Sequence, residues 1–98
     1  MEFVKKLKEK SKLYQDEGIK IVGIFGSYAR GDYDEYSDVD IAYKIDYDKF
    51  FTKYKDGFSQ ILRLDDIRKE LEKFLGKKVD FIPYESDKIT EDEIAYVW

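Results

Sequence analysis

The segment Ile19–Phe25 (IKIVGIF) constrains the fold most, because it is apolar on both faces apart from Lys20. It is short and rich in β-branched residues, which is typical of a buried strand at the centre of a sheet. A chain of 98 residues, of which 43% are hydrophobic, has enough apolar surface for one core around such a strand. We therefore expect a single domain over residues 1–98.

Two segments have the apolar spacing of helices that bury one face. In residues 3–14 apolar positions recur at helical spacing with lysines between them, and Gly18 follows where a glycine ends a helix. Residues 61–75 repeat this pattern, and Gly76 follows them. Residues 47–58 are aromatic and lysine-rich, and we interpret them as a further helix.

Two further segments have the pattern of strands. Asp38–Ile45 alternates strictly between apolar and polar residues, which predicts a half-buried strand with its carboxylates on the open face. Val79–Ile82 (VDFI) predicts a third strand that Pro83 ends, and Thr90 with Glu93 fits a capping box for a short final turn. This order predicts an α/β (α+β) fold, a small mixed β-sheet flanked by helices.

The composition excludes several kinds of chemistry. The chain has no His and no Cys, which excludes disulfides, zinc sites built on these residues, thiol nucleophiles and a Ser-His-Asp relay. A metal ion would have to bind oxygen ligands, which favours Mg²⁺, Mn²⁺ or Ca²⁺. The net charge of −4 and a pI near 4.9 argue against general binding of a nucleic-acid duplex.

The N-terminal stretch MEFVKKLKEK is lysine-rich and has no apolar stretch behind it, so it does not resemble a signal peptide. No apolar run approaches the roughly 20 residues that are needed to cross a bilayer. We therefore expect a cytoplasmic protein with no membrane partner.

Gly26 and Ser27 directly follow the predicted central strand. A glycine at that point lets the backbone turn sharply and approach a ligand closely. If Ser27 begins a short helix, its N–H groups and hydroxyl face the same space, and such a helix start binds phosphate. Arg30 follows on the same turn, where it would reach a phosphate or hold the loop. A structural turn alone would also explain the glycine and the serine.

Three aspartates form the acidic part of the pattern. Asp38 and Asp40 stand two residues apart on one strand, so their side chains leave the same face with Cα atoms about 6.5–7 Å apart. Carboxylates so placed can ligate one Mg²⁺ or bridge two ions about 3.5–4 Å apart. Asp80 joins them if its strand pairs beside theirs, whereas each acid taken singly is explained as a solvated or edge-strand charge. The spacing does not match an EF-hand, and the chain has no Walker A loop.

Together these residues resemble the signature of the DNA polymerase β-like nucleotidyltransferases, which is Gly-Ser, ten residues and then Asp-x-Asp. In this chain the signature consists of Gly26, Ser27, Asp38 and Asp40. The flanking segments 29–31 (ARG) and 37–41 (SDVDI) resemble the minimal nucleotidyltransferases (MNT), small stand-alone members that are often paired with a HEPN-domain protein as antitoxin and toxin. The resemblance extends from the first predicted helix to the strand that carries Asp80.

The resemblance implies a nucleotidyltransferase fold and the transfer of a nucleoside monophosphate, usually AMP from ATP, to a hydroxyl with release of pyrophosphate. It implies that the nucleotide-binding residues are Gly26, Ser27 and Arg30, and that the catalytic and metal-binding residues are Asp38, Asp40 and Asp80. Two Mg²⁺ ions, with Mn²⁺ as the alternative, would stabilise the charge on the attacking and leaving oxygens. Such a reaction depends on positioning and electrostatics, so a site without His or Cys is adequate.

We expect the 98 residues to form no further domain that would hold a drug, a tRNA or a primer, and their acidity disfavours a long nucleic acid. We therefore expect another protein to present the acceptor. The MNT resemblance implies a HEPN-type toxin that is modified on a hydroxyl side chain such as Tyr and thereby silenced. Two alternatives stay open: an antitoxin that neutralises its partner by occlusion without catalysis, and a transferase acting on a small-molecule hydroxyl.

Overall fold

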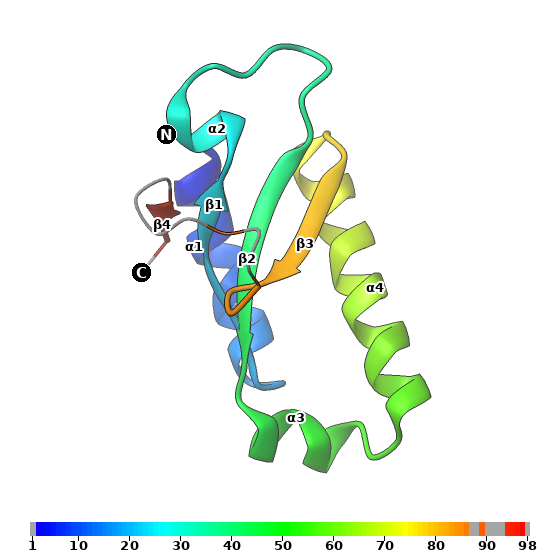
Figure 1. The fold of residues 1–98 in the computed structure, drawn as a ribbon. Helices are drawn as coiled ribbons and strands as arrows, with labels where there is room; N and C mark the ends of the chain where they lie inside the picture. Colours follow the sequence, from blue (N-terminus) through cyan, green and yellow to red (C-terminus); the bar gives the residue numbers. More distant parts are fainter. Residues whose placement is uncertain (1, 87–88, 90–93, 98) are drawn as a thin grey trace.

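A four-stranded sheet in the order β3-β2-β1-β4 forms the centre of the computed structural model, which describes residues 2–86, 89 and 94–97 (Figure 1). β1 pairs antiparallel with β2 and with β4, whereas β2 pairs parallel with β3. This architecture confirms the predicted small mixed sheet flanked by helices. The elements are α1 (Glu2–Gln15), β1 (Ile19–Phe25), α2 (Ser27–Arg30), β2 (Val39–Ile45), α3 (Tyr47–Lys53), α4 (Gly57–Leu75), β3 (Val79–Pro83) and β4 (Ala95–Tyr96).

The position of β1 agrees with its apolar sequence. It lies between β2 and β4, and all its residues except Lys20 are buried. A β-bulge between Ile21 and Gly23 shifts the pairing with β2. As a result Ile21 and Ile24 belong to the apolar cluster on one face of the sheet, and Val22 belongs to the cluster on the other face.

The main core lies on the face that α1 and α4 cover. Ile67, Leu71 and Leu75 of α4 and Leu7 and Tyr14 of α1 pack there against the strands. Burying an aliphatic side chain of this size contributes about 1.5–3 kcal/mol, so these helical faces account for the packing of both helices on the sheet. The apolar patterns predicted for residues 3–14 and 61–75 are therefore confirmed as the faces of α1 and α4 that contact the sheet.

The start of α4 differs from the sequence prediction. It begins at Gly57 and not at Ile61, because the Asp56 carboxylate accepts a hydrogen bond from the Ser59 N–H at 2.8 Å and caps the helix earlier. The helix predicted over residues 47–58 is correspondingly shorter, since α3 ends at Lys53.

The ends of the last strands also differ. Pro83 is the final residue of β3 and does not stop the strand before it, which an edge strand tolerates. Ala95 and Tyr96 form β4, which pairs with β1, so the C-terminal segment extends the sheet. Thr90 and Glu93, on which the predicted capping box depends, lie outside the described residues. In the part of the chain that the structure describes, no helix is long and apolar enough to span a bilayer.

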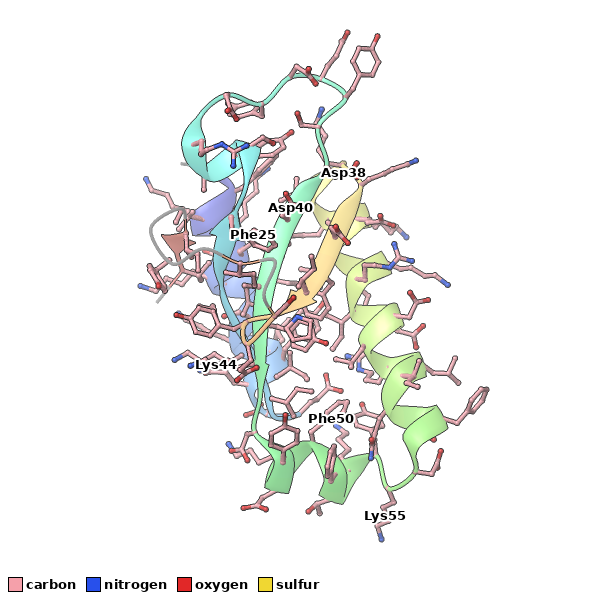
Figure 2. The ribbon with its side chains drawn as sticks, viewed as in Figure 1. Phe25, Asp38, Asp40, Lys44, Phe50 and Lys55 are labelled. Atoms are coloured by element: carbon pink, nitrogen blue, oxygen red, sulfur yellow. The ribbon has the colours of Figure 1, made fainter. Side chains whose placement is uncertain are left out.

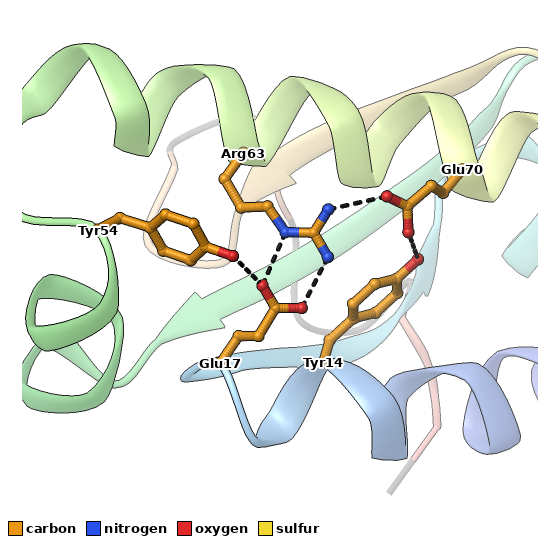
Figure 3. Close-up of polar contacts among 5 residues, drawn as sticks. All are labelled: Tyr14, Glu17, Tyr54, Arg63 and Glu70. Carbon is orange, nitrogen blue, oxygen red and sulfur yellow. Dashed lines mark hydrogen bonds and ion pairs between the residues drawn. The ribbon is translucent and has the colours of Figure 1, made fainter.

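A polar network joins side chains of α1 and α4 to two residues outside the helices, Glu17 after α1 and Tyr54 after α3 (Figure 3). Arg63 of α4 donates to both carboxylate oxygens of Glu17, at 2.7 and 2.8 Å, and to Glu70 at 2.8 Å. The hydroxyl of Tyr14 donates to Glu70 at 2.9 Å, and the hydroxyl of Tyr54 donates to Glu17. The side chains of Glu17 and Arg63 are 12% and 19% exposed. The hydrogen bonds from Arg63 lower the pKa of the Glu17 carboxyl, so this ion pair stabilises the folded chain.

We expect Arg63→Met to lower the free energy of unfolding at pH 7 by about 1–3 kcal/mol, because it leaves Glu17 half-buried without its cation. Since the pKa of Glu17 is lowered in the folded state, its contribution is present above the ordinary carboxyl pKa and is lost as the pH falls. Urea unfolding at pH 7 and pH 3 should therefore show a difference between variant and wild type that shrinks in acid. Lys69→Met is the matched control, because the Lys69 side chain, which pairs with Asp65 on the same helix, is 63% exposed. An equal loss in both variants would contradict the role given to Arg63.

Candidate active site

The predicted acids gather at the end of the sheet where β1 ends and β2 and β3 begin. Asp40, the second residue of β2, has Phe25 as its Cα partner on one side and Asp80 on the other. Because β2 and β3 are parallel and in register, the side chains of Asp40 and Asp80 leave the same face of strands about 4.8 Å apart. Asp38 directly precedes β2, and Figure 2 shows it at the same end of the strand as Asp40. The expectation that the Asp80 strand pairs beside the Asp38 strand is confirmed.

The acids lie on the face of the sheet opposite α1 and α4. In β2, Val39 and Ile41 are buried in the main core, whereas Ala42 belongs to the cluster on the opposite face. Asp40 shares that face with Ala42 because side chains alternate along a strand. Phe25, its neighbour on β1, is buried in the same cluster. One side of the Asp40 carboxylate therefore borders apolar surface.

Gly26 brings the end of β1 against Asp40. Its backbone has φ 74° and ψ −146°, a conformation that side-chain-bearing residues rarely adopt. A Cβ atom at this position would also overlap the Oδ2 atom of Asp40. Ser27 then begins α2, whose turn is closed by the Arg30 N–H donating to the Gly26 carbonyl at 3.0 Å. The sharp turn and short helix predicted after the central strand are confirmed.

The carboxylates influence one another electrostatically. The pKa of the half-buried Asp40 is raised, first by burial and then by the charges of Asp80 and Asp38, while Arg30 acts in the opposite sense. Asp38 and Asp80 are exposed. Within the described ranges, no three ligating side chains already close around a common point as metal ligands do. The fold thus brings the acids to one patch without pre-forming a closed cage.

The donor set fits a hard cation. The whole chain offers no imidazole or thiolate, and the patch consists of carboxylates beside a glycine whose missing side chain leaves room at Asp40. Carboxylate oxygens are the ligands that Mg²⁺ and Mn²⁺ prefer. Asp38, Asp40 and Asp80 are the residues that could hold such an ion.

The loop between α2 and β2 is anchored at one end and open at the other. The ring of Tyr33 stacks on Tyr28 with centroids 4.2 Å apart, and Tyr28 packs in turn against Phe3 of α1. Arg30 donates through Nε to the Asp32 carboxylate at 3.1 Å. Tyr36 is 84% exposed near the end of the loop. Of the two loop tyrosines, one is therefore held by packing and the other faces solvent.

Two lysines next to the acids were not identified from the sequence. Lys77 and Lys78 line a groove of about 380 Å³ that also borders Asp38. Their position directly before the strand of Asp80 is the sequence signal that points to them.

Comparison with known proteins identifies the family. Residues 1–96 match the family model described as a nucleotidyltransferase domain. The chain belongs to this family. It is a nucleotidyltransferase and therefore an enzyme, as the Gly-Ser and Asp-x-Asp residues predict, and its relatives confirm the predicted resemblance to the minimal branch.

Two relatives and one solved structure illustrate the similarity. A Methanocaldococcus jannaschii protein with the provisional name protein adenylyltransferase is 38% identical over 96 residues, which cover 90% of this nucleotidyltransferase and 88% of the relative. Protein adenylyltransferase MntA of Thermococcus cleftensis is 33% identical over 73 residues, covering 74% and 64%. A crystal structure described as a toxin-antitoxin with AMP-PNP aligns with a TM-score of 0.63 at 19% identity, covering 95% of this chain and 72% of that one. At that identity the likeness shows the fold.

We expect Gly26→Ala to abolish most nucleotidyl transfer, because the added methyl group displaces the Asp40 carboxylate. Gly31→Ala is the matched control, since Gly31 also has a positive φ of 84° but an added Cβ would meet no atom within 4 Å. The control should lose about 1–2 kcal/mol of stability from backbone strain alone and keep its activity. Urea unfolding and a transfer assay measure the two effects. Equal losses of activity would contradict the steric argument.

We expect Asp40→Asn to raise the free energy of unfolding at neutral pH when a chelator is present. The pKa of Asp40 is raised in the folded state, so its favourable contribution is complete below the ordinary carboxyl pKa and is lost as the pH rises through the raised value. The advantage of the variant should therefore disappear in acid. Urea unfolding from pH 3 to pH 8 tests this, with Asp66→Asn on the exposed side of α4 as the control. A variant less stable than wild type at pH 7 would contradict the prediction.

Proposed function

We propose that this nucleotidyltransferase transfers AMP from ATP to a hydroxyl group of a partner protein and acts as the antitoxin of a toxin–antitoxin pair. The observation that carries the proposal is the register of β2 and β3, which pairs Asp80 with Asp40 beside the turn at Gly26. The names of the relatives, which are protein adenylyltransferases, support the reaction. The toxin-antitoxin structure with AMP-PNP, an analogue of ATP, supports both the nucleotide and the partner.

In this proposal the start of α2 binds the triphosphate. The turn at Gly26 directs the backbone N–H and the hydroxyl of Ser27 toward the β- and γ-phosphate oxygens. Arg30 lies on the same short helix, and its charge reaches Asp40. A guanidinium binds phosphate oxygens through paired hydrogen bonds, so Arg30 moves from Asp32 to the nucleotide when ATP binds. These contacts hold the pyrophosphate that leaves.

Asp38, Asp40 and Asp80 hold the divalent ions, two Mg²⁺ or Mn²⁺, in this proposal. Because the strands fix the backbones of Asp40 and Asp80 side by side, rotation of the side chains suffices to bring their oxygens together. The bound ions supply stabilisation of the charge that develops on the attacking and leaving oxygens. A cation held by these residues would offset the repulsion that raises the pKa of Asp40 and would favour its ionised carboxylate.

The transfer forms one bond and breaks one. The acceptor oxygen bonds to the α-phosphorus of ATP, the bond from that phosphorus to the bridging oxygen breaks, and pyrophosphate leaves. The proton of the acceptor hydroxyl goes to Asp80, which is exposed on the β3 side of the site. The resemblance to the minimal nucleotidyltransferases leads us to propose a HEPN-domain toxin as the partner and a tyrosine hydroxyl as the acceptor, whose modification silences the toxin.

The test combines the protein with labelled ATP, Mg²⁺ and the product of the adjacent gene. We expect label to pass to that product, and Asp38→Asn plus Asp40→Asn to reduce the transfer about 100-fold or more, because the charge of the metal site is removed. Asp65→Asn plus Asp66→Asn on α4 removes the same charge elsewhere and should leave the transfer unchanged. Chelation of the metal should also abolish the label.

Three results would overturn the proposal. An unlabelled partner, or equal labelling by the double variant of Asp38 and Asp40, would exclude catalysis by these acids. Rescue of cell growth by a variant that lacks all three carboxylates would show that the protein neutralises its partner by occlusion.

A further inference from the structure

The candidate active site has two sides, one at the Gly26 turn, where the proposed function places the triphosphate, and one at β3. Across the end of the sheet, Gly26 follows β1, Asp40 lies on β2 and Asp80 lies on β3. If the turn at Gly26 holds the leaving pyrophosphate, in-line attack brings the acceptor from the opposite side of the α-phosphate. The acceptor therefore approaches from the β3 side. This step rests on the proposed function.

A groove of about 380 Å³ lies on that side of the site. The backbone of Val39 donates to the Lys78 carbonyl at 2.8 Å, which fixes the turn before β3 beside Asp38. Across the groove, the Lys77 ammonium donates to the Glu35 carbonyl at 3.4 Å and ties this turn to the loop before β2. The groove is lined by Glu35, Tyr36, Ser37, Asp38, Gly76, Lys77 and Lys78. Two segments distant in the sequence thus form a groove that borders Asp38, a predicted metal ligand.

One wall of this groove is basic although the chain as a whole carries a net charge of −4. A second hollow of about 440 Å³ shares Lys77 and Lys78 and continues past Lys73 in the last turn of α4. We call these three lysines the basic rim. The acid in that hollow, Glu72, is engaged by Arg68 at 3.1 Å and by the Val79 N–H at 2.9 Å.

The dipole of α4 explains one member of the basic rim. Lys73 complements the partial negative charge at the C-terminus of α4. Lys77 and Lys78 follow the end of the helix, so the helix dipole does not account for them. Their place at the mouth of the site accounts for them if an anionic group passes there.

We propose that the groove receives the segment of the partner protein that bears the acceptor hydroxyl, and that acidic side chains flanking this hydroxyl pair with the basic rim. Tyr36, at 84% exposure, offers an aromatic surface on the opposite wall. Pairing of complementary charges sets the register of a docked segment and speeds its association. Register matters here because the acceptor oxygen must meet the α-phosphorus in line.

The first experiment measures binding without catalysis. Three fluorescent 15-residue peptides with a central tyrosine, flanked by Glu and Asp, by Ser and Gly, or by Lys and Arg, are titrated with the protein in fluorescence anisotropy. We expect the acidic peptide to bind at least about 5-fold tighter than the neutral one at low salt, and the difference to shrink as salt screens the charges. Lys77→Glu plus Lys78→Glu should remove the preference. Lys5→Glu plus Lys8→Glu on the solvent face of α1 changes the net charge equally and should preserve it.

The second experiment measures transfer to the labelled partner. The rim variant should lower kcat/KM for the partner about 10-fold while the KM for ATP stays within about 2-fold, because the phosphate side is untouched. Lys78→Gln provides a milder substitution if the double variant unfolds. It should also lower kcat/KM for the partner, by a smaller factor, and leave the KM for ATP unchanged.

The outcomes separate docking on the basic rim from the proposed transfer reaction. Equal binding of the acidic and neutral peptides, or loss of the preference in the α1 variant, overturns the inference while leaving the proposed transfer intact. Tighter binding of a single-stranded RNA of matched charge than of the acidic peptide also overturns it, because the rim would then bind phosphodiesters. Peptide preference with an unlabelled partner supports the groove as a binding surface and shows that the proposed function has failed separately.

Discussion

The parallel pairing of β2 with β3 is the interaction on which the site depends. It pairs Asp40 with Asp80, which are forty residues apart in the chain, and it does so at the end of the sheet where the Gly26 turn lies. A parallel pair needs a long crossover, and here α3 and α4 provide it. The core contacts of α4 with the sheet and the bond from the Val79 N–H to Glu72 therefore position a carboxylate that they do not touch.

The two charged clusters of the molecule have opposite effects on the stability of the fold. At the far end, Arg63 and Glu17 form a half-buried ion pair in which donors and acceptors are matched, and the pair stabilises the fold. At the site, Asp40 is half-buried beside two further carboxylates, which raises its pKa and disfavours its charged form. A protein can maintain such unfavourable clustering when a ligand relieves it and when the remaining packing supplies enough stability. The stabilising network lies where it does not interfere with the site.

The neighbourhood of the acids is asymmetric, and this asymmetry gives the proposed reaction a direction. On the β1 side lie the Gly26 turn and the start of α2 at Ser27, whose N–H and hydroxyl groups we propose to bind phosphate oxygens. The β3 side presents a groove with a basic wall and an exposed tyrosine. In the proposed docking mode, charge complementary to the basic rim aligns the acceptor segment.

Much of the architecture followed from local patterns. The apolar run Ile19–Phe25 predicts the central strand, and helical spacing identifies the faces of α1 and α4. Alternation places Asp40 on the face of β2 opposite the main core, but that face is not open as predicted, because Ala42 is buried there in a second apolar cluster. Such patterns are local because side-chain direction repeats along each element with a fixed period. The spacing from Gly-Ser to Asp-x-Asp likewise predicts the family that the comparison with known proteins identifies.

Other features were decided by the tertiary structure. The sequence could not determine that Asp80 is paired with Asp40, that a bulge in β1 places Ile21 and Ile24 on the same face, or that Ala95 and Tyr96 extend the sheet. Nor could it show that Tyr33 stacks on Tyr28 while Tyr36 stays exposed, or that Lys77 and Lys78 line a groove beside Asp38. These features depend on which distant segments pack together. Burial of the whole apolar core determines that packing, and the local sequence around the site residues does not.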